Sequence, residues 1–245
     1  MVNRPDGLDG RTIQRGYAQT QSAEIDAGLR AHMQKVYAYM AGGLALTGGV
    51  AYAVFQSADF APELFMGIMR NSMILLLASL GVGFFFSFRI HAIQTSTARV
   101  LFWVYALLLG LGLAPIFLAY TESSIARTFF ITAGTFMAMS LWGYTTKRDL
   151  TGMGNFLIMG LFGIILASIV NIFLGSTAIQ FAVSVLGVLI FTGLTAYDTQ
   201  KIKEMYWDAD GADVAAKKSI LGAFTLYLDF INLFLMLLRL VGDRR

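Results

Sequence analysis

The chain has 245 residues, of which 57% are hydrophobic and 13% are charged, and it contains no cysteine. An average soluble domain carries about 25% charged residues, and half that amount leaves too little polar surface to cover a soluble protein of this size. The same numbers exclude a disordered chain, and the missing cysteines exclude a disulfide scaffold and thiolate metal ligands. The composition therefore predicts an integral membrane protein.

The amino-terminal segment differs in character from the rest of the chain. It has no apolar run long enough for the core of a secretory signal, and it carries several basic side chains. These are Arg4, Arg11, Arg15, Arg30 and Lys35. We expect residues 1–35 to form a polar tail, with a short helix near residues 23–34, and residues 36–245 to form one membrane domain.

Downstream of this tail, seven stretches are long and apolar enough to cross a bilayer as helices, which takes about 20 residues each. They run over residues 36–56, 70–88, 100–120, 127–146, 154–174, 179–198 and 219–240. The apolar runs are continuous rather than alternating, which favours helices over the strands of a barrel. The uncharged stretch after Leu150 is too long for one crossing, and a polar turn at residues 171–177 divides it. The sequence thus predicts an all-α membrane protein with seven transmembrane helices.

Lysine and arginine are concentrated in the loops at one end of these predicted spans. The tail and the loops at residues 89–99, 147–150 and 201–218 are basic, whereas the alternate loops carry few positive charges. The positive-inside rule therefore predicts a cytoplasmic amino terminus. Seven crossings would leave the basic residues 243–245 outside, against the rule. A re-entrant last helix that returns to the cytoplasm is the alternative.

Ionisable side chains inside the spans are few, and each is informative because a charge at the bilayer centre costs about 2.5–3.5 kcal/mol. Asp229 lies near the middle of the seventh predicted span, Asp198 ends the sixth, and Arg239 lies toward the end of the seventh. Helical spacing puts the polar and small residues of the seventh span on one stripe. That stripe consists of Gly222, Thr225, Asp229, Asn232, Met236 and Arg239. In the sixth span, Thr195 and Asp198 share one face, so both faces predict contact between helices or a pathway.

If Asp198 and Asp229 face each other, they cannot both ionise cheaply in a medium of low dielectric constant, and one would keep its proton. Such a pair would serve as a proton sensor, or as a site for a hard cation such as calcium when both carboxyls are ionised. Alternatively, Asp198 is a solvated helix-end residue beside Lys201, and Asp229 is a hydrogen-bonded packing residue. The spacing leaves both interpretations open.

The sequence gives little support for a histidine site, a calcium-binding loop or an intramembrane protease. The histidines, His32 and His91, lie apart at interface positions, and we interpret them as structural or solvated. The acidic loop 208–213 lacks the residue spacing of a calcium-binding loop. An intramembrane aspartyl protease would also use two aspartates, but residues 226–229 do not match its Gly-Leu-Gly-Asp motif. We expect no catalytic residue, no cofactor and no nucleic-acid partner.

Three stretches resemble the signature segments of the Bax inhibitor family, the transmembrane Bax inhibitor motif proteins, and in particular its bacterial members. They are Leu141-Trp-Gly-Tyr-Thr-Thr-Lys-Arg-Asp-Leu-Thr151, Phe191-Thr-Gly-Leu-Thr-Ala-Tyr-Asp-Thr-Gln-Lys-Ile-Lys203 and Leu226-Tyr-Leu-Asp-Phe-Ile-Asn-Leu-Phe-Leu-Met-Leu-Leu-Arg239. The resemblance extends from about the first span to the end of the chain. It implies six helices around a central seventh and, for bacterial members, a pH-sensitive calcium leak in the inner membrane.

The resemblance also implies roles for individual residues and partners. Asp198 and Asp229 match the family's aspartate pair, and Arg239 matches its last-helix arginine. In some relatives a glutamate in the second span holds that arginine, but this sequence has no acid between Glu63 and Arg89. Besides lipids, protons and calcium ions, a membrane-bound AAA-type protease is an implied partner, because some bacterial relatives restrain one. A non-conducting regulator is therefore the alternative function, and the polar tail is the sequence feature that supports it.

Overall fold

The computed structural model describes the backbone of residues 10–245, with side chains from residue 27 onward, and this part of the chain is all-helical. The helices are α1 (Gly10–Gln56), α2 (Pro62–Arg89), α3 (Thr95–Leu113), α4 (Ile116–Ala119), α5 (Glu122–Thr145), α6 (Thr151–Leu174), α7 (Thr177–Glu204) and α8 (Ala212–Val241). They form seven segments long and apolar enough to cross a membrane, of which the third, Thr95–Ala119, combines α3 with the single turn α4. The prediction of an all-α protein with seven spans is confirmed.

Local sequence explains where the helices begin and end. Pro62 opens α2, where a missing backbone N–H costs nothing. The hydroxyl of Thr121 accepts from the Ser124 N–H at the start of α5. Gly175 ends α6 with a left-handed backbone, φ 61°, which a residue with a Cβ adopts less readily. The short turn between α6 and α7 is the one predicted from the polar residues 171–177.

Helix α1 is longer than the first predicted span, because it begins at Gly10 and includes most of the segment expected to be a tail. Its membrane-spanning part is Ala27–Gln56. The sequence has no proline between Pro5 and Pro62, and the polar segment is rich in alanine, glutamine and arginine, which favour helix. The low hydrophobicity before residue 36 thus predicted where the apolar part of α1 begins. It did not predict where the helix itself begins, which is nearer the amino terminus.

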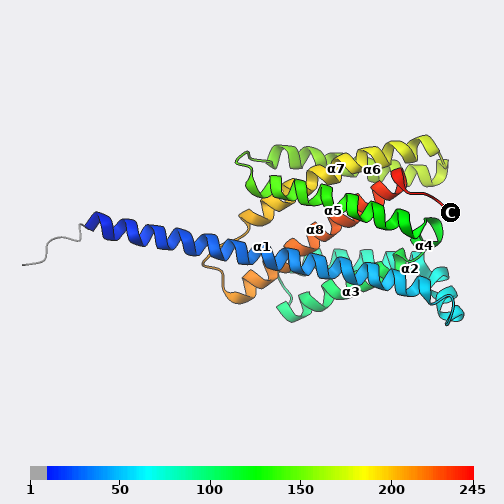
Figure 1. The fold of residues 1–245 in the computed structure, drawn as a ribbon, viewed down its shortest axis with the longest axis horizontal. Coiled ribbons are helices and arrows are strands. Elements are labelled where there is room, and N and C mark those ends of the chain that lie inside the picture. Colours follow the sequence, from blue (N-terminus) through cyan, green and yellow to red (C-terminus); the bar gives the residue numbers. More distant parts are fainter. Residues whose placement is uncertain (1–9) are drawn as a thin grey trace, which may run out of the picture.

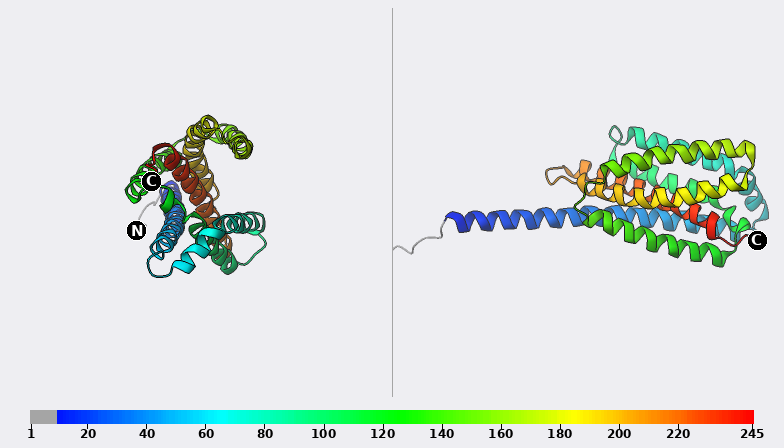
Figure 2. Two further views of the ribbon diagram at one scale, coloured as in Figure 1. Left: turned by 90° about the vertical axis from the view of Figure 1, so that its right-hand side faces the viewer. Right: turned by 90° about the horizontal axis from the view of Figure 1, so that it is seen from above.

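Helix α8 lies at the centre of the bundle (Figures 1 and 2). It packs directly on α1, α3, α5 and α7, while α2 packs mainly on α3, and α6 mainly on α7. Helix α2 still reaches the centre through Phe86, whose ring centroid lies 4.7 Å from that of Phe224 in α8. The expectation of six helices around a central seventh is confirmed.

The two ends of the bundle hold different parts of the chain. The amino-terminal part of α1 projects from the end that carries the α2–α3, α5–α6 and α7–α8 loops, whereas the carboxyl terminus lies at the opposite end (Figure 1). There the Arg245 N–H donates to the Ala119 carbonyl at 3.1 Å, and the Thr121 N–H donates to the Asp243 carbonyl at 3.1 Å. Because α8 is one continuous helix, this geometry favours a full seventh crossing over a re-entrant last helix.

Candidate functional site

The two predicted aspartates meet where α7 packs on α8. The side chains of Asp198 and Asp229 are within hydrogen-bonding contact of each other. Asp229 is 5% exposed, and its Oδ2 atom has no hydrogen-bond partner among the described residues. Two ionised carboxylates have no donor between them, so neither can satisfy the other. A single proton held by the pair would convert the contact into a hydrogen bond.

The pair lies closer to one end of the bundle than the sequence suggested. Asp198 is six residues from the end of α7, which at about 1.5 Å per residue is about 9 Å. Asp229 is at the same level because α7 and α8 pack antiparallel, whereas its position within α8 alone suggested the middle of a span. Lys201 follows Asp198 by one turn on α7. The pair is therefore near the end from which α1 projects.

The other predicted site residues divide between two surroundings. Thr195 is fully buried, and its hydroxyl donates to the Phe191 carbonyl at 2.8 Å within its own helix. Asn232 and Arg239 line a cavity on another side of α8, where the Asn232 amide donates to the Leu228 carbonyl at 2.9 Å. Arg239 is ten residues, about 15 Å, along α8 from Asp229, so it does not belong to the carboxyl pair.

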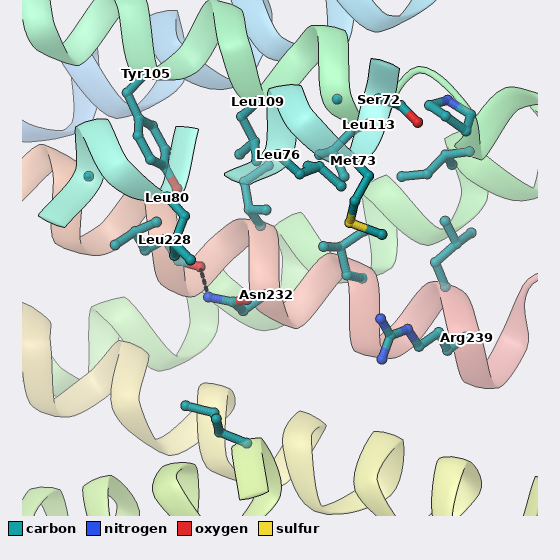
Figure 3. A pocket seen from close by; sticks show the side chains of 18 of the residues that line it. Ser72, Met73, Leu76, Leu80, Tyr105, Leu109, Leu113, Leu228, Asn232 and Arg239 are labelled. Atoms are coloured by element: carbon teal, nitrogen blue, oxygen red, sulfur yellow. Dashed lines mark hydrogen bonds between the residues drawn. The ribbon is translucent and has the colours of Figure 1, made fainter. Parts of the chain in front are cut away.

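This cavity, beside α8, has a volume of about 750 Å³ (Figure 3). It is bordered by α2, α3, α4, α6 and α8 and lined mainly by apolar side chains. Its polar lining comes from Ser72, Ser87, Tyr105, Tyr120, Asn232 and Arg239. The stripe predicted on α8 thus faces α7 at Asp229 and Met236 and faces the cavity at Asn232 and Arg239.

The sequence segments that carry the family resemblance contact one another. The Gln200 side chain accepts from the Leu150 N–H at 2.9 Å and donates to the Arg148 carbonyl at 2.8 Å. The Lys203 ammonium group donates to the Tyr144 carbonyl at 2.9 Å. Helices α5 and α7 approach so closely at Gly143 that an added Cβ would lie 2.2 Å from the Ala196 carbonyl oxygen. The loop between α5 and α6 is therefore held by the end of α7, beside Asp198.

A hydrogen-bonded chain beside the pair was not predicted from the sequence. The Tyr37 hydroxyl lies 2.6 Å from that of Ser140, which lies 3.0 Å from that of Thr199. The chain joins α1, α5 and α7, and Thr199 directly follows Asp198. Thr199 lies within the motif at residues 191–203, whereas Tyr37 and Ser140 come from segments distant in sequence. They could be predicted only if it were known which helices are neighbours.

The histidines differ from each other in the structure. His91 is exposed, as expected for a solvated side chain. His32 is 5% exposed and lies between α1 and α8, where its Nδ1 atom is 3.1 Å from the Ser219 hydroxyl. His32 therefore contributes to packing at the end from which α1 projects, as expected for a structural residue.

No group of three or more His, Cys, Asp or Glu side chains that could hold a metal ion occurs in the described part of the chain. The aspartate pair offers two carboxylates, fewer oxygen ligands than a dedicated calcium site supplies.

Comparison with known proteins agrees with the motifs. The sequence profile of the family described as "Inhibitor of apoptosis-promoting Bax1" matches residues 29–245. Inner membrane protein YbhL of Escherichia coli is 51% identical over 222 residues, covering 89% of this chain and 94% of YbhL. Protein RP147 of Rickettsia prowazekii is 49% identical, and the similarity covers 92% of this chain and 95% of the length of RP147. A membrane protein of Streptococcus pyogenes, SpyM3_0260, is 35% identical over 89% of this chain and 95% of its own.

The family match includes both aspartates and nearly all of the seven spans, and the matches confirm the resemblance seen in the three motifs. Together with the inner-membrane relative, the seven apolar helices support a multi-pass inner membrane protein. The chain belongs to the Bax inhibitor family.

Proposed function

We propose that this protein is a proton-controlled, calcium-permeable leak in the inner membrane, with its amino terminus in the cytoplasm. The observation that carries the proposal is the contact between the Asp198 and Asp229 carboxyl groups at the surface of the central helix. One shared proton joins α7 to α8 at this point. Loss of that proton leaves two like charges in contact, which favours separation of the two helices.

The surroundings of the pair support this proposal. Asn232 and Arg239 line the 750 Å³ cavity on another side of α8, and Thr195 lies one turn before Asp198. We assign the pair to proton sensing and transient cation contact, and Asn232, Thr195 and Arg239 to the pathway beside it. The basic loops at the end from which α1 projects support the cytoplasmic orientation. The proposal involves no catalytic residue and no cofactor.

Calcium flux into proteoliposomes, measured at a series of pH values, tests the proposal. We expect the flux of the unaltered protein to change with pH and that of the double variant Asp198→Asn/Asp229→Asn to be independent of pH. Each single variant keeps one carboxyl, so its response should move along the pH axis. Asp208→Asn, in an exposed loop, is the matched control and should behave as the unaltered protein. An unchanged pH response in the double variant would contradict the proposal.

A second candidate function rests on a different observation. Helix α1 projects beyond the bundle as a continuous helix from Gly10, which a pore alone does not require (Figure 1). We propose as the alternative that this projection binds a membrane-bound AAA-type protease or another membrane complex without conducting ions. Deletion of residues 1–28 should then abolish co-purification of the partner, and the unaltered protein should carry no calcium flux in proteoliposomes. If association with the protease survives the deletion, this version fails.

A further inference from the structure

We propose that the groove between α1 and α5, at the end from which α1 projects, binds one acyl chain of an anionic phospholipid, with the lipid phosphate at Arg30. Both helices lie against α8, and between them is a groove of about 520 Å³. In Figure 1 the α8 ribbon is visible between α1 and α5. Neither aspartate lines this groove, and it shares no lining residue with the 750 Å³ cavity, so this proposal does not depend on the calcium leak.

The groove has the length of one leaflet of a bilayer. On α1 its lining runs from Arg30 to Ala41, eleven residues or about 16 Å along the helix. Half of the hydrocarbon core of a bilayer is about 15 Å thick. The groove thus runs from the polar boundary to about the middle of the membrane, the depth that an acyl chain of that leaflet occupies.

The walls of the groove suit a flexible apolar chain. Met33, Met40 and Met137 line it, and methionine adapts its shape to irregular or variable ligands. Met137 and Leu141 are exposed on the side of α5. At the floor, the Tyr37 and Ser140 hydroxyls bond to each other at 2.6 Å, so they present little unsatisfied polarity to an apolar chain.

The mouth of the groove is basic, which determines the kind of headgroup. Arg30 lines the mouth on α1, and Tyr144 lines it on α5. The Lys203 ammonium group lies 5.2 Å from the centre of the Tyr144 ring. Lys147 and Arg148 follow within four residues of Tyr144. Tyrosine at headgroup depth and arginine beside it are the side chains that bind lipid phosphate at an interface.

The other end of the same two helices provides an internal contrast. There a second groove, of about 570 Å³, also lies between α1 and α5, but its mouth carries Glu122 and Ser123. Glu122 has Arg245 3.5 Å away, so this mouth presents an ion pair rather than a basic surface. Charge therefore selects the Arg30 end of the molecule for an anionic lipid.

Native mass spectrometry of the full-length protein in a non-ionic detergent tests the proposal, with palmitoyl-oleoyl phosphatidylglycerol and phosphatidylcholine as the two probes. The unaltered protein should bind phosphatidylglycerol about five-fold more tightly, the effect of one basic side chain on an anionic lipid. Arg30→Gln should remove this preference, and Arg30→Lys should retain most of it. Ala41→Phe, which fills the groove from an exposed position, should weaken binding of both lipids.

Two matched controls separate this site from general electrostatics and from general effects of substitution. Arg127→Gln changes the net charge equally at the opposite end of α5, and Ala138→Phe adds the same volume at an exposed position of α5 outside the groove. Both controls should bind the two lipids as the unaltered protein does. Equal binding of the two lipids to the unaltered protein, or an effect of the controls as large as that of Arg30→Gln and Ala41→Phe, would overturn the proposal.

Discussion

Helices α8 and α6 are both long apolar helices, yet they occupy opposite environments. In the most hydrophobic 18-residue stretch of α8, 56% of the residues are buried inside the protein, against 6% in α6. Helix α6 is nevertheless the more hydrophobic of the two. Its phenylalanine side chains face outward, with Phe173 85% exposed. The helix at the centre of the molecule carries Asp229, Asn232 and Arg239 instead.

The difference in burial between α8 and α6 follows from the lipid that surrounds the protein. Lipid tails are as apolar as leucine, so hydrophobicity drives a helix into the bilayer without driving it to the centre of the bundle. Polar and small side chains are stable only where other helices cover or bond them. In this protein the most hydrophobic segment therefore marks the lipid-facing periphery, and polar or small residues mark the interior. The comparison predicts that equal substitutions on interior and lipid-facing surfaces have unequal effects.

The largest expected effect is at Gly143, on the interior face of α5. A Cβ there would lie 2.2 Å from the Ala196 backbone oxygen, which cannot move without shifting α7. We expect Gly143→Ala to reduce the free energy of unfolding by about 3 kcal/mol. Gly134 in the same helix has open space around it, so Gly134→Ala should be neutral or stabilise by up to about 1 kcal/mol. Thermal unfolding in detergent measures both, and equal losses would contradict the comparison.

A leucine pair compares α8 and α6 directly. Leu233 of α8 is fully buried, whereas Leu166 of α6 is 64% exposed. Leu233→Ala should cost about 2 kcal/mol, because the cavity it leaves loses packing contacts even where no water is involved. Leu166→Ala should cost less than about 0.5 kcal/mol, because lipid fills the space. A large loss at Leu166 would show that α6 is buried by a partner chain rather than by lipid.

The sequence predicted the spans, the central helix and the two aspartates because each depends on local pattern or on a motif. Apolar run length is a property of one segment, and the 171–177 turn was visible in its polar residues. The level of Asp229 could not be predicted from α8 alone, because it depends on how α8 is aligned with α7. The Tyr37–Ser140–Thr199 chain likewise needs three helices to be neighbours. Pairing of helices is a property of the fold that no single segment encodes.

A buried pair of hydroxyl groups tests the same difference between interior and lipid-facing surfaces, with a smaller expected loss of stability. The Thr47 hydroxyl donates to the Ala106 carbonyl at 2.9 Å and so accepts from Tyr227 of α8 at 2.6 Å. Tyr227→Phe should reduce the free energy of unfolding by about 1 kcal/mol. Tyr52→Phe is the control, because Tyr52 is exposed and accepts from Gln56 of its own helix. The comparison fails if both substitutions have the same effect.

The smallest expected effect is at the start of α6, where the lipid-facing helix is held by a polar contact in water. The Asp149 carboxylate accepts from the Thr151 N–H at 2.8 Å, and the hydrogen bonds from Thr151 lower the pKa of Asp149 below its usual value. A lowered pKa in the folded protein means that this contact stabilises fully above the unfolded value of about 3.9 and is lost as the pH falls through the folded value.

Asp149→Ala should therefore lower the melting temperature slightly, by less than Tyr227→Phe does. The decrease should be equal at pH 7 and pH 5 and should shrink toward about pH 3, as the carboxylate of the unaltered protein takes up its proton. Asp208→Ala, in the α7–α8 loop, is the matched control and should show no such dependence. A decrease that stays constant down to pH 3 would mean that Asp149 acts through its size rather than its charge. The start of α6 would then be fixed by packing against α7, as at Gly154 and Tyr197, and not by its polar end.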